Sequence, residues 1–220
     1  MAPFGASRAG LMSVTRDDIP DPVVLPESGD LNHFEGNTDQ FEINDDDPVI
    51  FTEVNNLSVK NTSGSSEGDR IVSFSGLDNY PEQGDTFSCF LREDSNQPLA
   101  IMLFGVQDYD FEFYGAGISD GVSEFRLFKD GLGGGDTIAS TSVSLSTEEW
   151  YDVEVEWETD GTITARLFEV DQSSGERQSQ MESISTTDTD YSNGGVGFAK
   201  GMSSGNATFD FYRLGGGVGE

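Results

Sequence analysis

One segment of the chain, WYDVEVEWETDGTITARLF (150–168), carries an acidic residue at every second position. These acids are Asp152, Glu154, Glu156 and Glu158. Because alternate side chains of a strand point to opposite faces, the four acids share one face, with neighbours roughly 6.5–7 Å apart. Inverting glycoside hydrolases use carboxylates separated by ~6.5–9.5 Å, one as general acid and one as general base. The spacing therefore permits glycoside hydrolysis.

The same pattern also fits the wet face of an antiparallel strand. The row extends to Asp152, one step beyond a three-residue catalytic set, and the turn at Asp160-Gly161 follows Glu158 almost at once. Since the chain holds 41 Asp and Glu, an acidic outer face is the expected background. We predict that the row is solvated surface, and keep hydrolysis through Glu154 and Glu158 as the alternative.

Short alternating runs separated by Gly, Asn, Asp and Ser clusters begin at residue 31, and helical periodicity is almost absent. The predicted strands are 41–43, 49–54, 57–60, 70–76, 86–92, 99–106, 109–115, 122–129, 137–145, 151–158, 162–170, 178–185, 195–200 and 206–214. Asp160-Gly161 and Asp130-Gly131 predict hairpin turns. This pattern predicts an all-β fold, an antiparallel two-sheet β-sandwich over residues 31–214.

The two ends of the chain differ from this central part. Residues 1–30 contain four of the seven prolines and no strand alternation, which predicts an extended N-terminal arm for anchoring or oligomerisation. A frayed terminus is the alternative. Residues 215–220 (GGGVGE) predict a flexible tail.

Three stretches resemble the concanavalin A-like (laminin-G-like) lectin and glucanase jelly rolls. They are the hairpin 150–168, the opening DLNHFEGNTDQF (30–41), and the closing GGVGFA (194–199) with ATFDFYRL (207–214). The resemblance covers residues 30–214 and implies a jelly-roll sandwich. Glu154-Val-Glu156-Trp-Glu158 also resembles the E-x-D-x-E strand of laminarinase-type glucanases. That match implies Glu154 as nucleophile, Glu156 as its helper in place of the family's Asp, and Glu158 as acid.

The resemblance also implies where ligands bind. Relatives hold a structural Ca²⁺ between their first and last strands, and Glu35 and Asp210 match the acidic positions used there. Sugars bind such sandwiches through aromatic rings and carboxylates, which makes Asp108, Tyr109 and Tyr114 the candidate ligand residues. An aromatic core strand is the alternative for this stretch. His33, the only histidine, is assigned to a loop.

Charge limits the classes of partner. Forty-one acids against eleven Lys and Arg give a net charge of −30, which is typical of proteins adapted to concentrated salt. The sequence has no basic patch for nucleic acid, no apolar run long enough to insert in a membrane, and no visible signal peptide. One cysteine, Cys89, excludes an intrachain disulfide and is predicted to be buried.

The opening FGASRAGLM (4–12) resembles the N-termini of structural proteins of haloarchaeal tailed viruses. We therefore expect a non-enzymatic virion-surface protein, a capsid turret, spike or tail-fibre component assembled in the host cytoplasm. Residues 1–30 would join it to other virion proteins in a homo-oligomer, and the sandwich would bind host-surface glycans. The alternatives are a glucanase-like hydrolase and a cellular halophilic lectin.

Overall fold

The computed structural model describes residues 31–32, 42–43, 51–54, 58–61, 69–73, 80–93, 99–108, 112–119, 121, 123–131, 136–172, 176–201 and 207–214. Among residues 31–73, a side chain is described only at Val72, and the strand at 207–214 is described by its backbone alone. The predicted arm (1–30) and tail (215–220) lie outside the described residues. In the described part of the chain, no helix combines the length and apolar character that crossing a bilayer requires.

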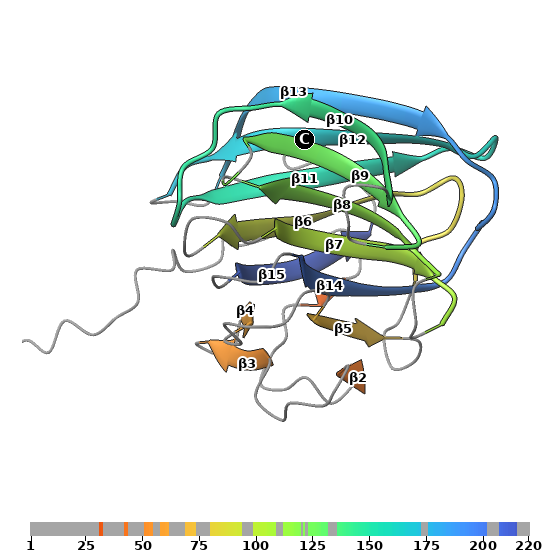
Figure 1. Ribbon diagram of the computed structural model, residues 1–220, viewed down its shortest axis with the longest axis horizontal. Coiled ribbons are helices and arrows are strands. Elements are labelled where there is room, and N and C mark those ends of the chain that lie inside the picture. Colours follow the sequence, from red (N-terminus) through yellow and green to blue (C-terminus); the bar gives the residue numbers. More distant parts are fainter. Residues whose placement is uncertain are drawn as a thin grey trace, which may run out of the picture.

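Two antiparallel sheets face one another (Figure 1). The first, sheet A, runs in the order β13-β12-β11-β6-β15-β4-β3, with β1 paired to β15; the second, sheet B, runs β10-β9-β8-β7-β14-β5-β2. The strands of sheet A are β1 (Leu31–Asn32), β3 (Phe51–Val54), β4 (Ser58–Asn61), β6 (Thr86–Glu93), β11 (Trp150–Trp157), β12 (Thr162–Val170), β13 (Arg177–Thr187) and β15 (Ala207–Leu214). Those of sheet B are β2 (Glu42–Ile43), β5 (Asp69–Ser73), β7 (Leu99–Val106), β8 (Tyr114–Ser119), β9 (Glu124–Lys129), β10 (Thr137–Ser142) and β14 (Gly195–Gly201). The predicted two-sheet jelly-roll sandwich is confirmed.

The hairpin at Asp160-Gly161 forms as predicted and joins β11 to β12. Asp160 accepts a hydrogen bond from the Thr162 backbone N–H through its carboxylate, at 2.9 Å. Gly161 has φ +84°, and a Cβ there would lie 2.6 Å from the Asp188 carbonyl oxygen. The turn therefore requires glycine for both its backbone conformation and its close packing.

The predicted strand at 109–115 differs from the structure: residues 109–111 lie outside the described residues, and 112 and 113 are not in a strand. β8 instead runs from Tyr114 to Ser119, the stretch YGAGIS, whose six residues are all buried. Alternation in DYDFEFY suggested a strand earlier in the chain, but the strand is the small-residue run that follows it. Small residues suit this position because a Cβ at Gly117 would lie 2.6 Å from the Ala100 carbonyl oxygen of the neighbouring β7.

The main core lies between the sheets and is dominated by aromatic rings. Trp157 of β11 meets Phe104 of β7 with ring centroids 5.5 Å apart, and meets Tyr114 of β8 at 5.8 Å, both edge to face. A second buried cluster includes Ile101 and Leu103, which alternate with core residues along β7 and so lie on the opposite face of sheet B. Cys89 is buried, as predicted.

Candidate functional site

The acidic row lies on the face of sheet A that points away from sheet B. Val153, Val155 and Trp157 fill the core with no exposed surface, so the alternating Asp152, Glu154 and Glu156 face outward. Glu158 is not part of the strand. It lies exposed in the turn, where its backbone N–H donates to the Thr162 carbonyl at 2.8 Å.

Two arginines, from β12 and β13, form ion pairs with the three acids of this row that lie in the strand. Arg177 of β13 donates from Nε to Asp152 at 2.7 Å and from Nη1 to Glu154 at 2.6 Å. Arg166 of β12 donates to the other oxygen of Glu154 at 3.3 Å and to Glu156 at 2.6 Å. Burial lowers the pKa of Arg177, but Asp152 and Glu154 more than offset it, so the pKa is raised overall. Acids and arginines alternate in one continuous chain of ion pairs, which we call the carboxylate–arginine ladder.

The prediction that the row is solvated surface is wrong for its first two acids. Asp152 has no exposed surface and the Glu154 side chain is 12% exposed, whereas the Glu156 side chain is 42% exposed. The physical reason is coverage from β12 and β13. The Arg177 guanidinium lies 4.1 Å from the centre of the Phe168 ring, so cation and ring together close over the inner end of the ladder.

The ladder limits the chemistry of the row. Both oxygens of Glu154 accept hydrogen bonds from guanidinium groups, at 3.3 and 2.6 Å, which disfavours attack on a sugar or proton donation by this carboxylate. A two-carboxylate mechanism needs one such group on each side of the scissile bond. The arrangement on β11 is therefore that of a structural ion-pair network.

The candidate ligand residues do not share a surface. Tyr114 is buried in the core, and its hydroxyl donates a short hydrogen bond to Asp188. Burial, followed by the bond to Asp188, raises the pKa of Tyr114. Asp108 is exposed just after β7, and Tyr109 lies outside the described residues. The Tyr114 ring is therefore not accessible for stacking on a sugar, which fits the alternative of an aromatic core residue.

Asp108 lies beside an open groove of about 440 Å³ at one end of the sandwich. The groove is lined by Tyr80, Glu82, Val106, Gln107, Asn193, Gly194 and Gly195. Gln107 spans it by donating to the Gly105 and Asn193 carbonyls at 2.9 and 2.5 Å. Its amide is thus already engaged within the protein.

The predicted Ca²⁺ ligands cannot be placed. Glu35, the side chain of Asp210 and His33 lie outside the described residues. Within the described residues, no three His, Cys, Asp or Glu side chains gather in a way that would hold a metal ion. Calcium binding through Glu35 and Asp210 stays a prediction.

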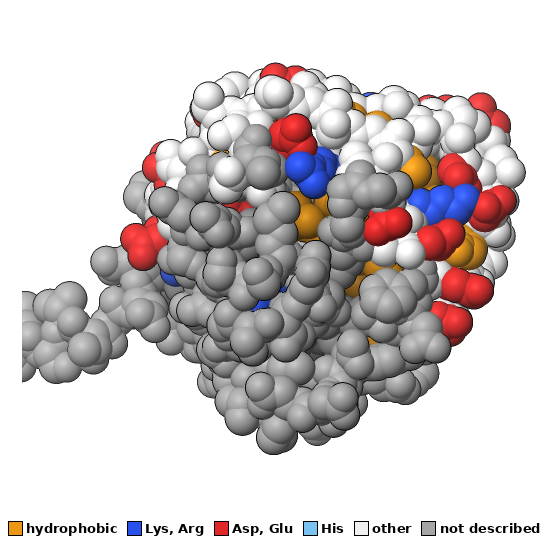
Figure 2. Space-filling view, in the orientation of Figure 1, with side chains coloured by type: hydrophobic (Ala, Val, Ile, Leu, Met, Phe, Trp, Pro, Cys, Tyr) orange, Lys and Arg blue, Asp and Glu red, His pale blue; other side chains and the backbone are white. Residues whose placement is uncertain are grey.

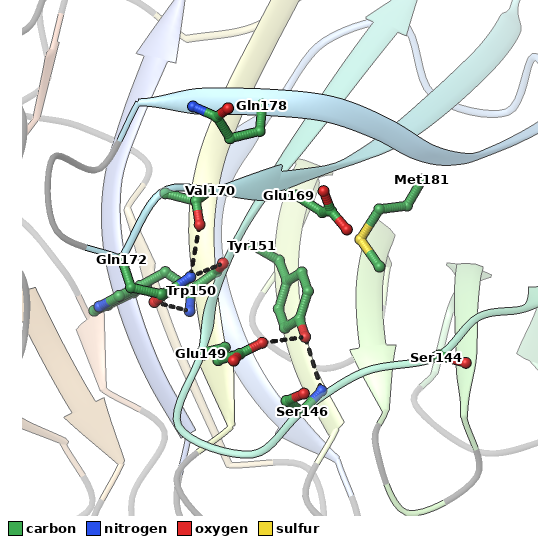
Figure 3. Close-up of a pocket in the computed structure, with 10 residues that line it drawn as sticks. All are labelled: Ser144, Ser146, Glu149, Trp150, Tyr151, Glu169, Val170, Gln172, Gln178 and Met181. Carbon is green, nitrogen blue, oxygen red and sulfur yellow. Dashed lines mark hydrogen bonds between the residues drawn. The ribbon is translucent and has the colours of Figure 1, made fainter.

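A second hollow, the Tyr151 pocket, lies where β11 begins and β12 ends (Figure 3). Its volume is about 260 Å³. The lining residues are Ser144, Ser146, Glu149, Trp150, Tyr151, Glu169, Val170, Gln172, Gln178 and Met181. They come from the connection between β10 and β11, from β11 and β12 with the turn that follows, and from β13.

Hydrogen bonds fix the walls of the Tyr151 pocket. The Tyr151 hydroxyl accepts from the Ser146 backbone N–H at 2.7 Å and donates to Glu149 at 3.3 Å. Gln172 accepts from the Trp150 backbone N–H at 2.9 Å, and its amide donates to the carbonyls of Trp150 and Val170 at 3.0 and 2.8 Å. Figure 3 shows these bonds on two sides of the hollow. The pocket is therefore formed before any ligand arrives.

The lining combines an apolar floor with a polar mouth. Tyr151, Val170 and Met181 supply the apolar surface, and the carboxylates of Glu149 and Glu169 with the amide of Gln178 are exposed at the mouth. No lysine or arginine lines the pocket, so it does not attract an anion. A hollow below the ~300–1,000 Å³ of drug-sized sites suits a ligand of about one sugar ring.

Sequence reasoning could have found part of these sites. The turn at Asp160-Gly161 fixes the register of the hairpin, and this register places Arg166 opposite Glu154. Arg177 was beyond reach because two register shifts interrupt the pairing of β12 with β13. The Tyr151 pocket gives no sequence signal, since its residues come from three separate parts of the chain.

Comparisons with known proteins identify the fold of this chain but no family to which it belongs. No protein-family model and no curated protein sequence matches the chain. Carbohydrate-binding module CBM66 from Bacillus subtilis is 14% identical with a TM-score of 0.57, covering 78% of this chain and 92% of that one. A Bacillus licheniformis β-glucanase is 8% identical with a TM-score of 0.56, covering 86% and 99%. A Shewanella oneidensis protein of unknown function is 13% identical with a TM-score of 0.55, covering 97% and 95%. These similarities establish the jelly-roll sandwich, a fold shared by binding modules and hydrolases.

Proposed function

We propose that this protein is a carbohydrate-binding sandwich without catalytic activity. The observation that favours binding over hydrolysis is the carboxylate–arginine ladder. Arg166 and Arg177 occupy both oxygens of Glu154, the residue that would serve as nucleophile in a glucanase. A site built for hydrolysis needs a free carboxylate of this kind. Binding requires only a pre-formed hollow with suitable hydrogen-bonding groups.

The Tyr151 pocket is the proposed site, and one neutral sugar residue is the proposed ligand. Hydroxyl groups of a sugar both donate and accept hydrogen bonds. Glu149 and Glu169 each accept one hydrogen bond within the protein, from Tyr151 and Ser179, and can accept others. The Gln178 amide makes one long bond, 3.3 Å to the Glu176 carbonyl, and can both donate and accept. The apolar C–H face of the ring would lie on the floor formed by Tyr151 and Met181. The size of the pocket favours a terminal sugar residue of a longer glycan.

A glycan array in molar KCl, followed by calorimetry on the strongest hit, tests this proposal. We expect Glu149→Gln and Gln178→Ala each to weaken binding of the hit by about tenfold, the effect of losing one hydrogen bond of ~1.4 kcal/mol. Gln107→Ala, in the open groove, is the matched control and should leave binding unchanged. If Gln107→Ala is the only variant that loses binding, the sugar site is the open groove and not the Tyr151 pocket. If the wild-type protein binds no glycan on the array, the proposal is overturned.

Hydrolysis is tested separately with β-glucan in the same buffer. We expect no release of reducing ends from wild-type protein. Release that disappears in Glu154→Gln, while that variant stays folded, would establish the glucanase alternative. Because this readout is independent of binding, either half of the proposal can fail without the other.

We also propose that the sandwich is presented on a virion surface in concentrated salt. The support comes from the acidic composition and from the virus-like sequence of residues 4–12. Antibody labelling of purified haloarchaeal tailed-virus particles that encode this chain, viewed by electron microscopy, provides the test. Labelling confined to host cells would favour the cellular lectin.

A further inference from the structure

One side of the sandwich carries almost no charge, although the chain as a whole carries −30. β10 ends sheet B and β13 ends sheet A, and these two terminal strands lie side by side at the top of Figure 1. Thr141 of β10 and Glu182 of β13 are linked by a 3.5 Å hydrogen bond. The corresponding margin of Figure 2 is mostly white, whereas acidic side chains gather on the right of that view.

The sequence explains this neutrality. Residues 137–147 (TIASTSVSLST) contain no charged residue at all. Residues 177–187 contain one arginine and one glutamate, and Arg177 already belongs to the carboxylate–arginine ladder. In a chain where charged residues make up 24% of the sequence, two neutral edge strands placed together are a distinct feature. We propose that β13 is the contact through which a second copy of this chain binds, edge to edge and antiparallel.

The edge of β13 is suited to such pairing. Among the described residues, β12 is the only strand whose backbone pairs with β13, and β10 lies beside β13 through the Thr141–Glu182 contact. The other edge of β13 therefore has no backbone ladder in the described part of the chain and is available for pairing. From Glu182 to Thr187 the register with β12 is regular, and both register shifts lie nearer Arg177. In natural proteins, lysine, proline or other charged residues on an edge strand prevent it from pairing with another chain. The stretch 183–187 (SISTT) has none of these.

Electrostatics favours this contact over others on the described surface. Two copies that each carry −30 repel one another, and the repulsion is least where neither copy places a charge. At molar salt the screening length falls to about 3 Å, so close neutral surfaces meet with little long-range penalty. The exposed hydroxyls of Ser183, Ser185 and Thr187 can then pair across the new strand contact.

The pairing has a consequence for ligand binding. Gln178 and Met181 of β13 line the Tyr151 pocket, toward the start of the strand. Two strands joined antiparallel over 183–187, with Ser185 opposite Ser185 of the second copy, would place the two pockets roughly 35 Å apart along the strand direction, from ~3.3 Å per residue. A dimer would thus present two sites to a surface dense in glycans and bind it more tightly than one site could. This gain rests on the proposed function, whereas the dimer itself does not.

Size-exclusion chromatography with light scattering in molar KCl tests the interface on the full chain. Wild-type protein is expected at twice the 23.8 kDa chain mass at micromolar concentration. The variant Ser183→Asp/Ser185→Asp places like charges opposite one another across the contact, and we expect its dimer dissociation constant to rise at least tenfold. Thr159→Asp/Ser192→Asp, at exposed turn positions, adds the same charge and should remain dimeric.

The outcomes separate the interface from the fold and from glycan binding. Near-ultraviolet circular dichroism of the buried tryptophans checks that each variant is folded, and single-site sugar affinity should be equal in both. Monomeric wild-type protein would overturn the proposal. A folded Ser183→Asp/Ser185→Asp variant that stays dimeric would also overturn it, and would place the contact elsewhere, residues 1–30 being the predicted place.

Discussion

Arg177 bridges Asp152 and Glu154 from a strand two places away in sheet A. Its partner Asp152 has no exposed surface, so the carboxylate depends on nearby donors in place of water. The sequence suggested that these acids were either catalytic or solvated. The structure adds a third role, because a single cation from β13 makes the acid row part of the packing of the sheet.

Replacing Arg177 by Met is expected to lower the free energy of unfolding by about 3–5 kcal/mol, since it removes one partner of a buried ion pair. Urea unfolding in molar KCl, followed by tryptophan fluorescence, measures the loss. The control Arg126→Met breaks the pair with Glu124, whose side chain is 32% exposed, and should cost about 1 kcal/mol or less. Equal losses in the two variants would contradict the buried role of Arg177.

A double variant sharpens this test. Replacing the pair by apolar residues, Asp152→Leu with Arg177→Met, removes both buried charges together. Most of the lost stability should return, because the fully buried Asp152 charge is removed together with its partner, while Glu154 loses Arg177 but keeps its bond to Arg166. A double variant no more stable than Arg177→Met would show that Arg177 acts through other contacts, such as its packing on Phe168.

At the scale of elements, a polar cluster joins three parts of the chain. Lys129 at the end of β9 donates to Asp188 at 2.7 Å and also binds Asp190, both in the connection between β13 and β14. Tyr114 at the start of β8 donates to the same Asp188, and Tyr191 donates to Asp130. This cluster holds the connection that continues into Asn193 and Gly194 of the open groove.

The cluster predicts how stability depends on pH. Burial raises the pKa of Asp188, but hydrogen bonds from Lys129 and Tyr114 outweigh it and lower the pKa overall. A lowered carboxyl pKa stabilises the fold above the unfolded value of about 3.9, and this contribution is lost as the pH falls through the folded value. Burial lowers the pKa of Lys129, and its bonds to Asp188 and Asp190 raise it overall. That contribution is present below about pH 10.4 and is lost as the pH rises.

Lys129→Met should therefore lower the free energy of unfolding near neutral pH by about 1–3 kcal/mol, because a mostly buried carboxylate loses its charged donor. The loss should shrink as the pH falls through the lowered pKa of Asp188, because there the carboxyl takes up a proton in the folded wild-type protein as well. Urea unfolding between pH 3 and 8 measures both effects. Lys129→Arg keeps the cation and should follow the wild-type curve. A loss in Lys129→Met that is independent of pH would indicate a packing defect.

Most strands could be predicted from the sequence, because the position of a strand along the chain follows from the local alternation of polar and apolar residues. The strand 162–170 and the turn at Asp160-Gly161 were placed correctly because both signals are local. The strand predicted at 109–115 differs from β8 because the alternation in DYDFEFY is a stronger local signal than the small residues of YGAGIS. Those small residues are explained only by the close packing of β8 against β7. Arg166 could be placed from the hairpin register, whereas Arg177 depends on register shifts between β12 and β13 that no local pattern encodes.

At the scale of the whole molecule, the fold class followed from composition and periodicity, but the neighbours in each sheet did not. β6 lies between β11 and β15, strands that are distant from it in sequence. The neutral edge brings together β10 and β13 from different sheets, and the Tyr151 pocket forms where the connection after β10 meets β11, β12 and β13. Sequence alone therefore predicted the sandwich, while the proposed sugar site could be inferred only from the arrangement of the strands.

The net charge of −30 predicts that stability rises with salt. Screening reaches ~30 Å at 0.01 M salt and ~3 Å at 1 M, so added KCl removes repulsion between exposed acids. It also weakens exposed ion pairs, but each of these contributes only about 0–1 kcal/mol, and the 41 acids far outnumber the 11 Lys and Arg. The urea midpoint should therefore rise steadily from 0.01 to 1 M KCl.

A variant with four exposed acids replaced by amides identifies repulsion as the cause of this salt dependence. The substitutions are Glu82→Gln, Asp108→Asn, Glu112→Gln and Glu158→Gln, all at exposed positions. Compared with the wild-type protein, this variant should unfold at higher urea in 0.01 M KCl, and the two midpoints should converge in 1 M KCl because screening has already removed the repulsion. Parallel salt curves for the two proteins would contradict the charge argument, and would indicate that salt acts on the apolar core, which added salt stabilises regardless of net charge.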